Sequence, residues 1–123
     1  MASSNYVIKH TSQVIYATLP SGSKAYLKYL VDGNTMKLLE TYVPPEFRGK
    51  GIAARLLEYA VNLAQSNGWL IEPVCSYAIH YFARNPSKRG ILVERYRDLS
   101  EEGWKRLFEE ARAREAKKGG DRS

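Results

Sequence analysis

Apolar and polar positions alternate along the first third of the chain in the manner of β-strands. Residues 24–31 ("KAYLKYLV") alternate clearly, and residues 13–19 ("QVIYATL") are mostly β-branched and aromatic. The sequence "DGN" is typical of a tight turn, so we expect residues 24–31 to form a hairpin with residues 35–43. A shorter strand is expected over residues 5–10.

The pattern becomes helical after Pro44 and Pro45, which end the last strand because proline has no backbone N–H to donate. Apolar residues then recur at helical spacing from Ile52 to Leu63, and Gly68 follows as a stop signal. This amphipathic helix is the clearest element that the sequence predicts.

The next segments predict one more strand and a second helix. Residues 69–75 ("WLIEPVC") are typical of a buried strand that Pro73 interrupts. Residues 76–85 are expected to be helical, with Ser76 as the N-cap. The pattern of residues 90–96 ("GILVERY") fits either a strand or a short helix.

A last helix is predicted from Ser100, because an apolar stripe recurs there at helical spacing: Trp104, Leu107, Phe108 and Ala111. We expect residues 117–123 to be frayed or disordered. The order of elements predicts the α+β class, with a mixed, mostly antiparallel sheet and helices on its faces. We assign this unit to residues 1–99, and a C-terminal basic helix with a frayed tail to residues 100–123.

Composition narrows the class of protein. A chain of 123 residues suits one domain. Its single cysteine, Cys75, excludes an internal disulfide framework, and the two distant histidines add no metal-binding spacing, so we expect no metal. The N-terminal sequence has no apolar stretch long enough for a signal peptide or a membrane span. We therefore expect a cytoplasmic protein that does not act at membranes.

The formal net charge of +6, with a pI near 9.5, favours phosphate-bearing or polyanionic partners. Much of the excess is local, because residues 103–123 carry seven Lys or Arg against four Asp or Glu. Aromatic and basic residues are not interleaved as in known RNA-binding motifs, so we do not expect nucleic acid to be the partner.

The segment "RGKGIA" combines two glycines with two basic residues immediately before the clearest helix. A helix N-terminus carries unpaired N–H donors and a partial positive charge. Gly49 and Gly51 let a ligand approach the backbone, and Arg48 and Lys50 add full charges, which together favour a phosphate site. The alternative is a glycine-rich turn with basic residues on its surface, because short glycine patterns also occur by chance.

The segment "RGKGIAARLL" resembles the pyrophosphate-binding signature of the GNAT N-acetyltransferases, (Q/R)-x-x-G-x-(G/A). Arg48, Gly51 and Ala53 fill its three fixed positions. The segment "IEPVCSYAIHYFARNP" is similar to a small, stand-alone, single-domain branch with a Pro-x-Cys-x-Tyr motif. The resemblance covers about residues 26–92 and implies a GNAT-like fold.

The resemblance implies acetyl-coenzyme A as the acyl donor. Its pyrophosphate would be bound by the turn and the start of the helix, and its pantetheine arm would pair with the strand "LLETYV". A backbone N–H near Val43 would polarise the thioester carbonyl. The implied coenzyme-binding residues are Tyr42, Val43, Arg48, Gly49, Lys50, Gly51, Ile52 and Ala53.

Three residues are candidates for chemistry. Cys75 precedes a predicted helix whose dipole could lower its thiol pKa and let it take the acetyl group, although a lone cysteine is more often inert and buried. Tyr77 matches the place of the general acid in many GNAT enzymes. Glu40 could be the general base, but the small branch often has histidine there. We expect Tyr81 to pack in the core, and His80 to face away from Tyr77.

Two function classes follow. The chain is either an acetyltransferase acting on an amine, through direct transfer or a reactive cysteine, or a coenzyme A-binding regulatory or acyl-carrying module with little turnover. The sequence does not identify the acceptor, which is a small molecule or a protein amine. The sequence is compatible with either a monomer or a homodimer. The C-terminal helix is expected to dock on the sheet, although its basic face also suits an acidic partner.

Overall fold

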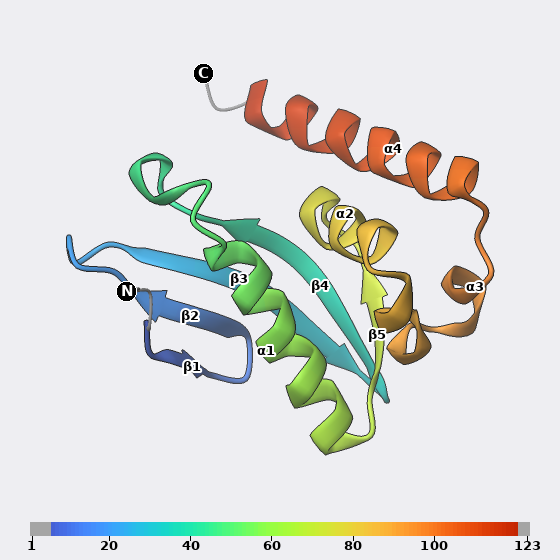
Figure 1. Cartoon of the computed structure of the whole chain (residues 1–123), viewed down its shortest axis with the longest axis horizontal. Helices are drawn as coiled ribbons and strands as arrows, with labels where there is room; N and C mark the ends of the chain where they lie inside the picture. Colours follow the sequence, from blue (N-terminus) through green and yellow to red (C-terminus); the bar gives the residue numbers. More distant parts are fainter. Residues whose placement is uncertain (1–5, 121–123) are drawn as a thin grey trace.

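The computed structural model describes the backbone of residues 6–120 and the side chains of residues 6–117. Five strands form one sheet in sequential order (Figure 1). They are β1 (Ile8–His10), β2 (Val14–Thr18), β3 (Lys24–Asp32), β4 (Thr35–Tyr42) and β5 (Leu70–Pro73). The first four pair antiparallel and β5 pairs parallel to β4. The predicted α+β class with a mixed, mostly antiparallel sheet is confirmed.

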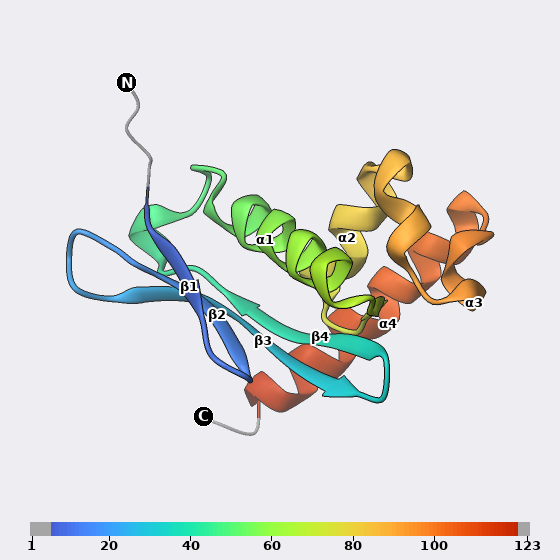
Figure 2. The same cartoon turned by 90° about the horizontal axis from the view of Figure 1, so that it is seen from below.

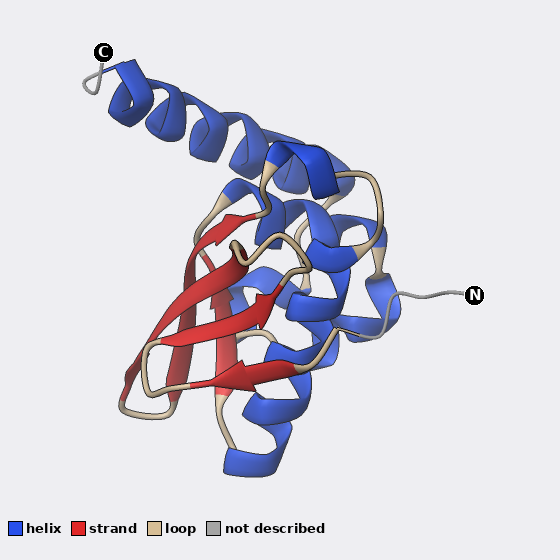
Figure 3. Cartoon of the chain, turned by 90° about the vertical axis from the view of Figure 1, so that its left-hand side faces the viewer, coloured by secondary structure: helices blue, strands red, loops and turns tan. Residues whose placement is uncertain are grey.

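The helices are α1 (Ile52–Asn67), α2 (Ser76–Arg84), α3 (Glu94–Arg97) and α4 (Glu101–Gly120), with short 3-10 turns η1 (Pro45–Phe47) and η2 (Pro86–Ile91). Helix α1 lies against one face of the sheet (Figures 2 and 3). Leu56 and Leu57 of α1 and Leu27 of β3 are fully buried between them. This helix–sheet layer is the core that holds the ends of β4, β5 and α1 in place.

Several expected boundaries are corrected. The strand after α1 ends at Pro73 instead of continuing to residue 75, because proline cannot donate to the ladder. Helix α2 does start at Ser76, but its N-cap residue is Cys75. Residues 90–96 are neither purely strand nor purely helix, since Leu92 forms an isolated bridge with Ile71 before α3 begins. Residue 5 of the first predicted strand lies outside the described residues.

A β-bulge interrupts the pairing of β3 with β4. Lys28 lies opposite Glu40 and Tyr29 lies opposite Leu38, which leaves Leu39 as an extra residue. Because side chains alternate with a period of two, the extra residue turns the rest of β4 over. Glu40 therefore shares a face with Lys28, while Thr41, two positions beyond Leu39, faces the helices.

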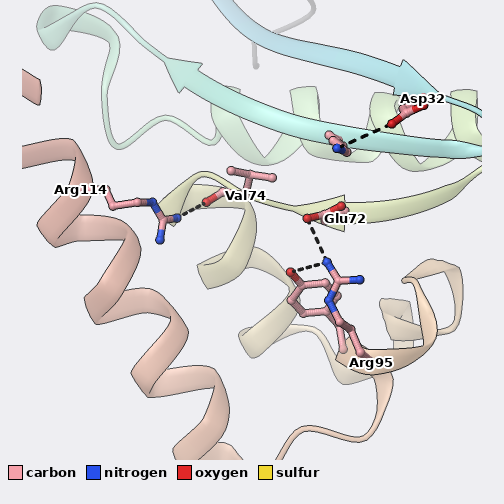
Figure 4. Close-up of polar contacts among 7 residues, drawn as sticks. Asp32, Glu72, Val74, Arg95 and Arg114 are labelled. Carbon is pink, nitrogen blue, oxygen red and sulfur yellow. Dashed lines mark hydrogen bonds and ion pairs between the residues drawn. The ribbon is translucent and has the colours of Figure 1, made fainter.

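Helix α4 docks on α2, and not on the sheet as expected (Figure 1). Trp104 and Ala111 are buried in this contact. The Arg114 guanidinium donates to the carbonyl of Val74 at 3.2 Å, near the end of β5 (Figure 4). The helix continues through Gly120, and residues 121–123 lie outside the described residues. The expected fraying of residues 117–123 stays a prediction.

Candidate active site

The strands β4 and β5 separate at the end of the sheet. Their pairing stops at Leu38 and Pro73, whereas β4 continues to Tyr42. The carbonyl of Leu38 accepts hydrogen bonds of 3.0 Å from the backbone N–H groups of both Val74 and Cys75. The chain then turns into α2. A gap therefore opens between the last part of β4 and the start of α2.

The predicted phosphate turn lies where β4 leads into α1. Gly49 and Gly51 have φ values of 78° and 81°, in the left-handed region that favours glycine. A Cβ atom added at either position would meet no atom within 4 Å. Helix α1 has no side-chain cap and no acidic residue in its first turn. Its first N–H groups are thus left for a ligand, and the turn leaves space for one to approach.

The Arg48 side chain is held against the end of β4. Its Nε atom donates to the carbonyl of Val43 at 2.8 Å, and its guanidinium lies 5.9 Å from the centre of the Tyr42 ring. These contacts place a full positive charge beside the glycine turn. Lys50 is exposed at the same turn.

A cleft of about 620 Å³ runs along this turn and into the gap. Except for Lys50, every residue predicted to bind the coenzyme lines it: Tyr42, Val43, Arg48, Gly49, Gly51, Ile52 and Ala53. A glycine-bordered helix N-terminus with an adjacent guanidinium fits a diphosphate. The residues present therefore fit the phosphate-bearing end of coenzyme A.

The opposite wall comes from α2 and α4. Tyr77 and His80 of α2 line the cleft, and their ring centroids lie 5.9 Å apart. The expectation that His80 faces away from Tyr77 is wrong, because positions three apart lie on one side of a helix. Phe108 and Arg112 of α4 complete the lining. The sequence predicts neither residue in the site, because the apolar stripe that contains Phe108 indicates only a docking face.

The Cys75 thiol is buried, with 5% of the residue exposed, and its Sγ lies 3.4 Å from Oγ1 of Thr41. Burial raises the pKa of this thiol above its ordinary value. The Thr41 hydroxyl and the N–H groups of Ala78 and Tyr77 lower the pKa, and the Glu115 carboxylate raises it. The helix N–H groups therefore lower the thiol pKa in the expected direction, but burial outweighs them and the net pKa is raised.

Glu115 of α4 caps the start of α2. Its carboxylate accepts hydrogen bonds from the Ser76 N–H at 2.8 Å and from the Ser76 hydroxyl at 2.7 Å. Ser76 is therefore the residue that is capped, and not the cap that was expected. The partners are 39 positions apart. No local sequence pattern indicates such a pairing, and for this reason the cap was missed.

A second cavity of about 240 Å³ adjoins the first. Both cavities are lined by Thr41, Ser76 and Tyr77. The second is also lined by Glu40 and Glu115, which contribute two carboxylates. Two cavities of different charge therefore meet at the gap beside Tyr77.

The other predicted residues are placed as follows. The Glu40 carboxylate accepts a hydrogen bond from the Tyr26 hydroxyl at 3.1 Å and lies 3.7 Å from Nζ of Lys28. Burial raises the pKa of Tyr77, so its phenol keeps its proton at neutral pH. Tyr81 is buried, as expected, with its ring edge-on to Phe82.

Within residues 6–120, no three His, Cys, Asp or Glu side chains are grouped as metal ligands would be. In the same part of the chain, no helix combines the length and apolar character needed to cross a membrane.

Comparison with known proteins identifies the family. Residues 15–91 match the model of the GCN5-related N-acetyltransferase family. The fold is also similar to the solution NMR structure of a GCN5-like candidate N-acetyltransferase from Staphylococcus aureus, with 26% identity and a TM-score of 0.60. That similarity covers 80% of this chain and 100% of the other. The chain therefore belongs to the GCN5-related N-acetyltransferase family.

Proposed function

We propose that this chain transfers an acetyl group from acetyl-coenzyme A directly to a primary amine. The observation that carries the proposal is the uncapped N-terminus of α1, bordered by open glycines, on the cleft that enters the gap between β4 and α2. A diphosphate bound there would place the rest of an extended ligand along β4, toward Tyr77.

On the donor side, the N–H groups from Gly49 to Ala53 bind the pyrophosphate, and the Arg48 guanidinium adds charge. The Arg48 N–H is not among these donors, because it already donates to the carbonyl of Pro45. The Val43 N–H, immediately after the end of β4, polarises the thioester carbonyl. Tyr42 and Val43 supply backbone groups beside the pantetheine arm. Lys50 lies outside the cleft lining, and its proposed contribution is a longer-range attraction for phosphate.

Tyr77 is the proposed general acid. It lines both cavities, and its raised pKa keeps the phenol protonated until a stronger base forms beside it. As the amine nitrogen bonds to the carbonyl carbon, the carbon–sulfur bond breaks and the phenol gives its proton to the departing thiolate. A positioned acid of this kind contributes about 10²- to 10⁴-fold to a rate.

The environment of Cys75 favours direct transfer over an acetyl-cysteine intermediate. A thiol must ionise to act as a nucleophile, but this one is buried, has a raised pKa and lies near the negative charge of Glu115. The same features argue against the alternative in which the chain carries an acyl group on Cys75. We assign Cys75 a packing role at the end of the gap.

The second cavity is the proposed acceptor site. Its Glu40 and Glu115 carboxylates would attract a cationic amine, and either could take the proton that the ammonium must lose before attack, directly or through water. Glu40 therefore stays the candidate base from the sequence, and Glu115 joins it. This charge pattern favours amines over neutral or acidic acceptors.

The test is thiol release from acetyl-coenzyme A with a panel of primary amines that includes polyamines, amino-acid esters and lysine peptides. We expect amine-dependent release in the wild type, and a fall in kcat of about 10²- to 10⁴-fold in Tyr77→Phe. Tyr81→Phe removes a hydroxyl from the next turn of the same helix and is the matched control, with activity within about twofold of wild type. No coenzyme binding and no amine-dependent release would overturn the proposal.

A further inference from the structure

Helix α4 lies outside the segment that matches the family. The matched region ends at residue 91, and α4 begins at Glu101. Nevertheless, Phe108 and Arg112 of α4 line the same cleft as the glycine turn. The added helix therefore forms part of the wall of the main cleft, in addition to its packing against α2.

The position of α4 is fixed by contacts on both sides of Arg112. Trp104 is buried, and the Arg89 guanidinium lies 4.9 Å from the centre of its ring. Farther along the helix, Glu115 accepts two hydrogen bonds from Ser76. Arg114 also donates to the carbonyl of Val74 (Figure 4). A helix held at both places presents Arg112 to the cleft in a defined position.

The Arg112 guanidinium is available to a ligand. Its side chain is exposed, and the guanidinium lies 6.0 Å from the centre of the Phe108 ring. Among the ion pairs of residues 6–117, none involves Arg112. Phe108 in turn lies 5.9 Å from the His80 ring, so an aromatic surface adjoins the charge. A planar guanidinium that lines an open cleft is well suited to bind a phosphate through two hydrogen bonds.

We propose that α4 completes the coenzyme site, with Arg112 binding a phosphate of coenzyme A across the cleft from Arg48. Phe108 supports the guanidinium and covers the ligand on that side. This inference rests on the proposed function, because it assumes that the cleft binds coenzyme A. It assigns to the C-terminal helix a role in holding the acyl donor.

The test is isothermal titration calorimetry with coenzyme A, comparing wild type with Arg112→Ala. We expect Kd to rise about 3- to 10-fold, as for an exposed charge-assisted contact. Arg106→Ala is the matched control: Arg106 is exposed on the same helix, and its loss lowers the net charge equally, but Arg106 does not line the cleft. Its Kd should stay within about twofold of wild type.

Two additional variants and a second ligand sharpen the result. Arg112→Glu should weaken binding more than the alanine variant, and Arg112→Lys should weaken it less, because lysine keeps the charge but loses the planar fork. Titration with dephospho-coenzyme A, which lacks the 3′-phosphate, identifies the phosphate that Arg112 contacts. If the alanine substitution costs the same factor with this ligand, the contact is to the pyrophosphate.

The outcomes separate this inference from the proposed function. If the wild type binds coenzyme A and both Arg112→Ala and Arg112→Glu bind it equally well, the inference is overturned and the proposed function stands. If the wild type does not bind coenzyme A, the proposed function is overturned, and the inference that rests on it is overturned as well. An equal loss in Arg106→Ala and Arg112→Ala would show a general charge effect and would also overturn the specific contact.

Discussion

Two glycines at opposite ends of α1 allow the ligand-binding role of the turn to be separated from its role in folding. Gly51 precedes the helix with φ 81° and ψ 8°, and Gly68 follows it with φ 72° and ψ 26°. At both positions an added Cβ would meet no atom within 4 Å. Substitution by alanine therefore lowers the free energy of unfolding only through the strain of the left-handed conformation, by about 1–2 kcal/mol at either site. The expected fall in Tm is roughly 3–10 °C for each variant.

Binding should distinguish the two variants, because only Gly51 lines the cleft. A methyl group at Gly51 would keep a diphosphate from the first N–H groups of α1, and the loss of one charge-assisted hydrogen bond is about 1.5–3 kcal/mol. We expect Kd for coenzyme A to rise tenfold or more (about 1.4 kcal/mol per tenfold) in Gly51→Ala, but to stay unchanged in Gly68→Ala. Calorimetry measures Kd, and thermal melting confirms that the two variants are equally stable. Equal affinities in two equally destabilised variants would refute the phosphate-turn assignment.

Three other predictions concern the buried thiol. In Cys75→Ser, amine-dependent turnover should stay within a few fold of wild type. Intact-mass measurements on the wild type should show no acetyl adduct. Loss of turnover in the variant, or an adduct on the wild type, would contradict direct transfer. Because the folded pKa of Cys75 is raised, its contribution to stability is present below the unfolded pKa of about 8.5 and is lost as pH rises above it. Between pH 7 and pH 10 the wild type should therefore lose more unfolding free energy, measured by denaturant titration, than Cys75→Ser. In Glu115→Gln the removed negative charge should lower the thiol pKa and speed alkylation by iodoacetamide at pH 8, while the amide oxygen still accepts the Ser76 N–H. An unchanged or slower alkylation rate would show that Glu115 does not hold the thiol protonated.

The parts of the fold that the sequence predicted depend on local patterns. The alternation of residues 24–31 predicted two distinct faces of β3, and the structure buries the face that carries Leu27 and Tyr29. Gly68 predicted the end of α1, because glycine readily adopts the left-handed conformation found there. The glycine turn was predicted from the same preference together with the resemblance to the family.

The bulge in β4 shows why the site was harder to predict than the fold. A regular strand would place Glu40 on the same face as Leu38, toward the helices. The extra residue Leu39 reverses this, so that Thr41 contacts Cys75 and Glu40 contacts Lys28. Residues 35–43 contain no glycine or proline, so no residue of this strand indicates a bulge in advance.

The contacts of α4 could not be predicted from the sequence, for a different reason. The apolar stripe predicted that the helix packs against another surface of the protein, but the stripe does not identify that surface. The pairing of Glu115 with Ser76 and the position of Arg112 depend on the angle at which α4 crosses α2. That angle is set by tertiary packing, which a single sequence does not reveal.

The central claim is that free amides at the start of α1 bind a coenzyme A diphosphate. The most direct measurement is a titration of ¹⁵N-labelled protein with coenzyme A, followed by the backbone amide resonances. The account predicts that the largest shifts fall on residues 48–53, with smaller shifts at Tyr77 and along the end of β4. Saturable binding whose shifts leave residues 48–53 unmoved, or the absence of binding at millimolar coenzyme A, would contradict it.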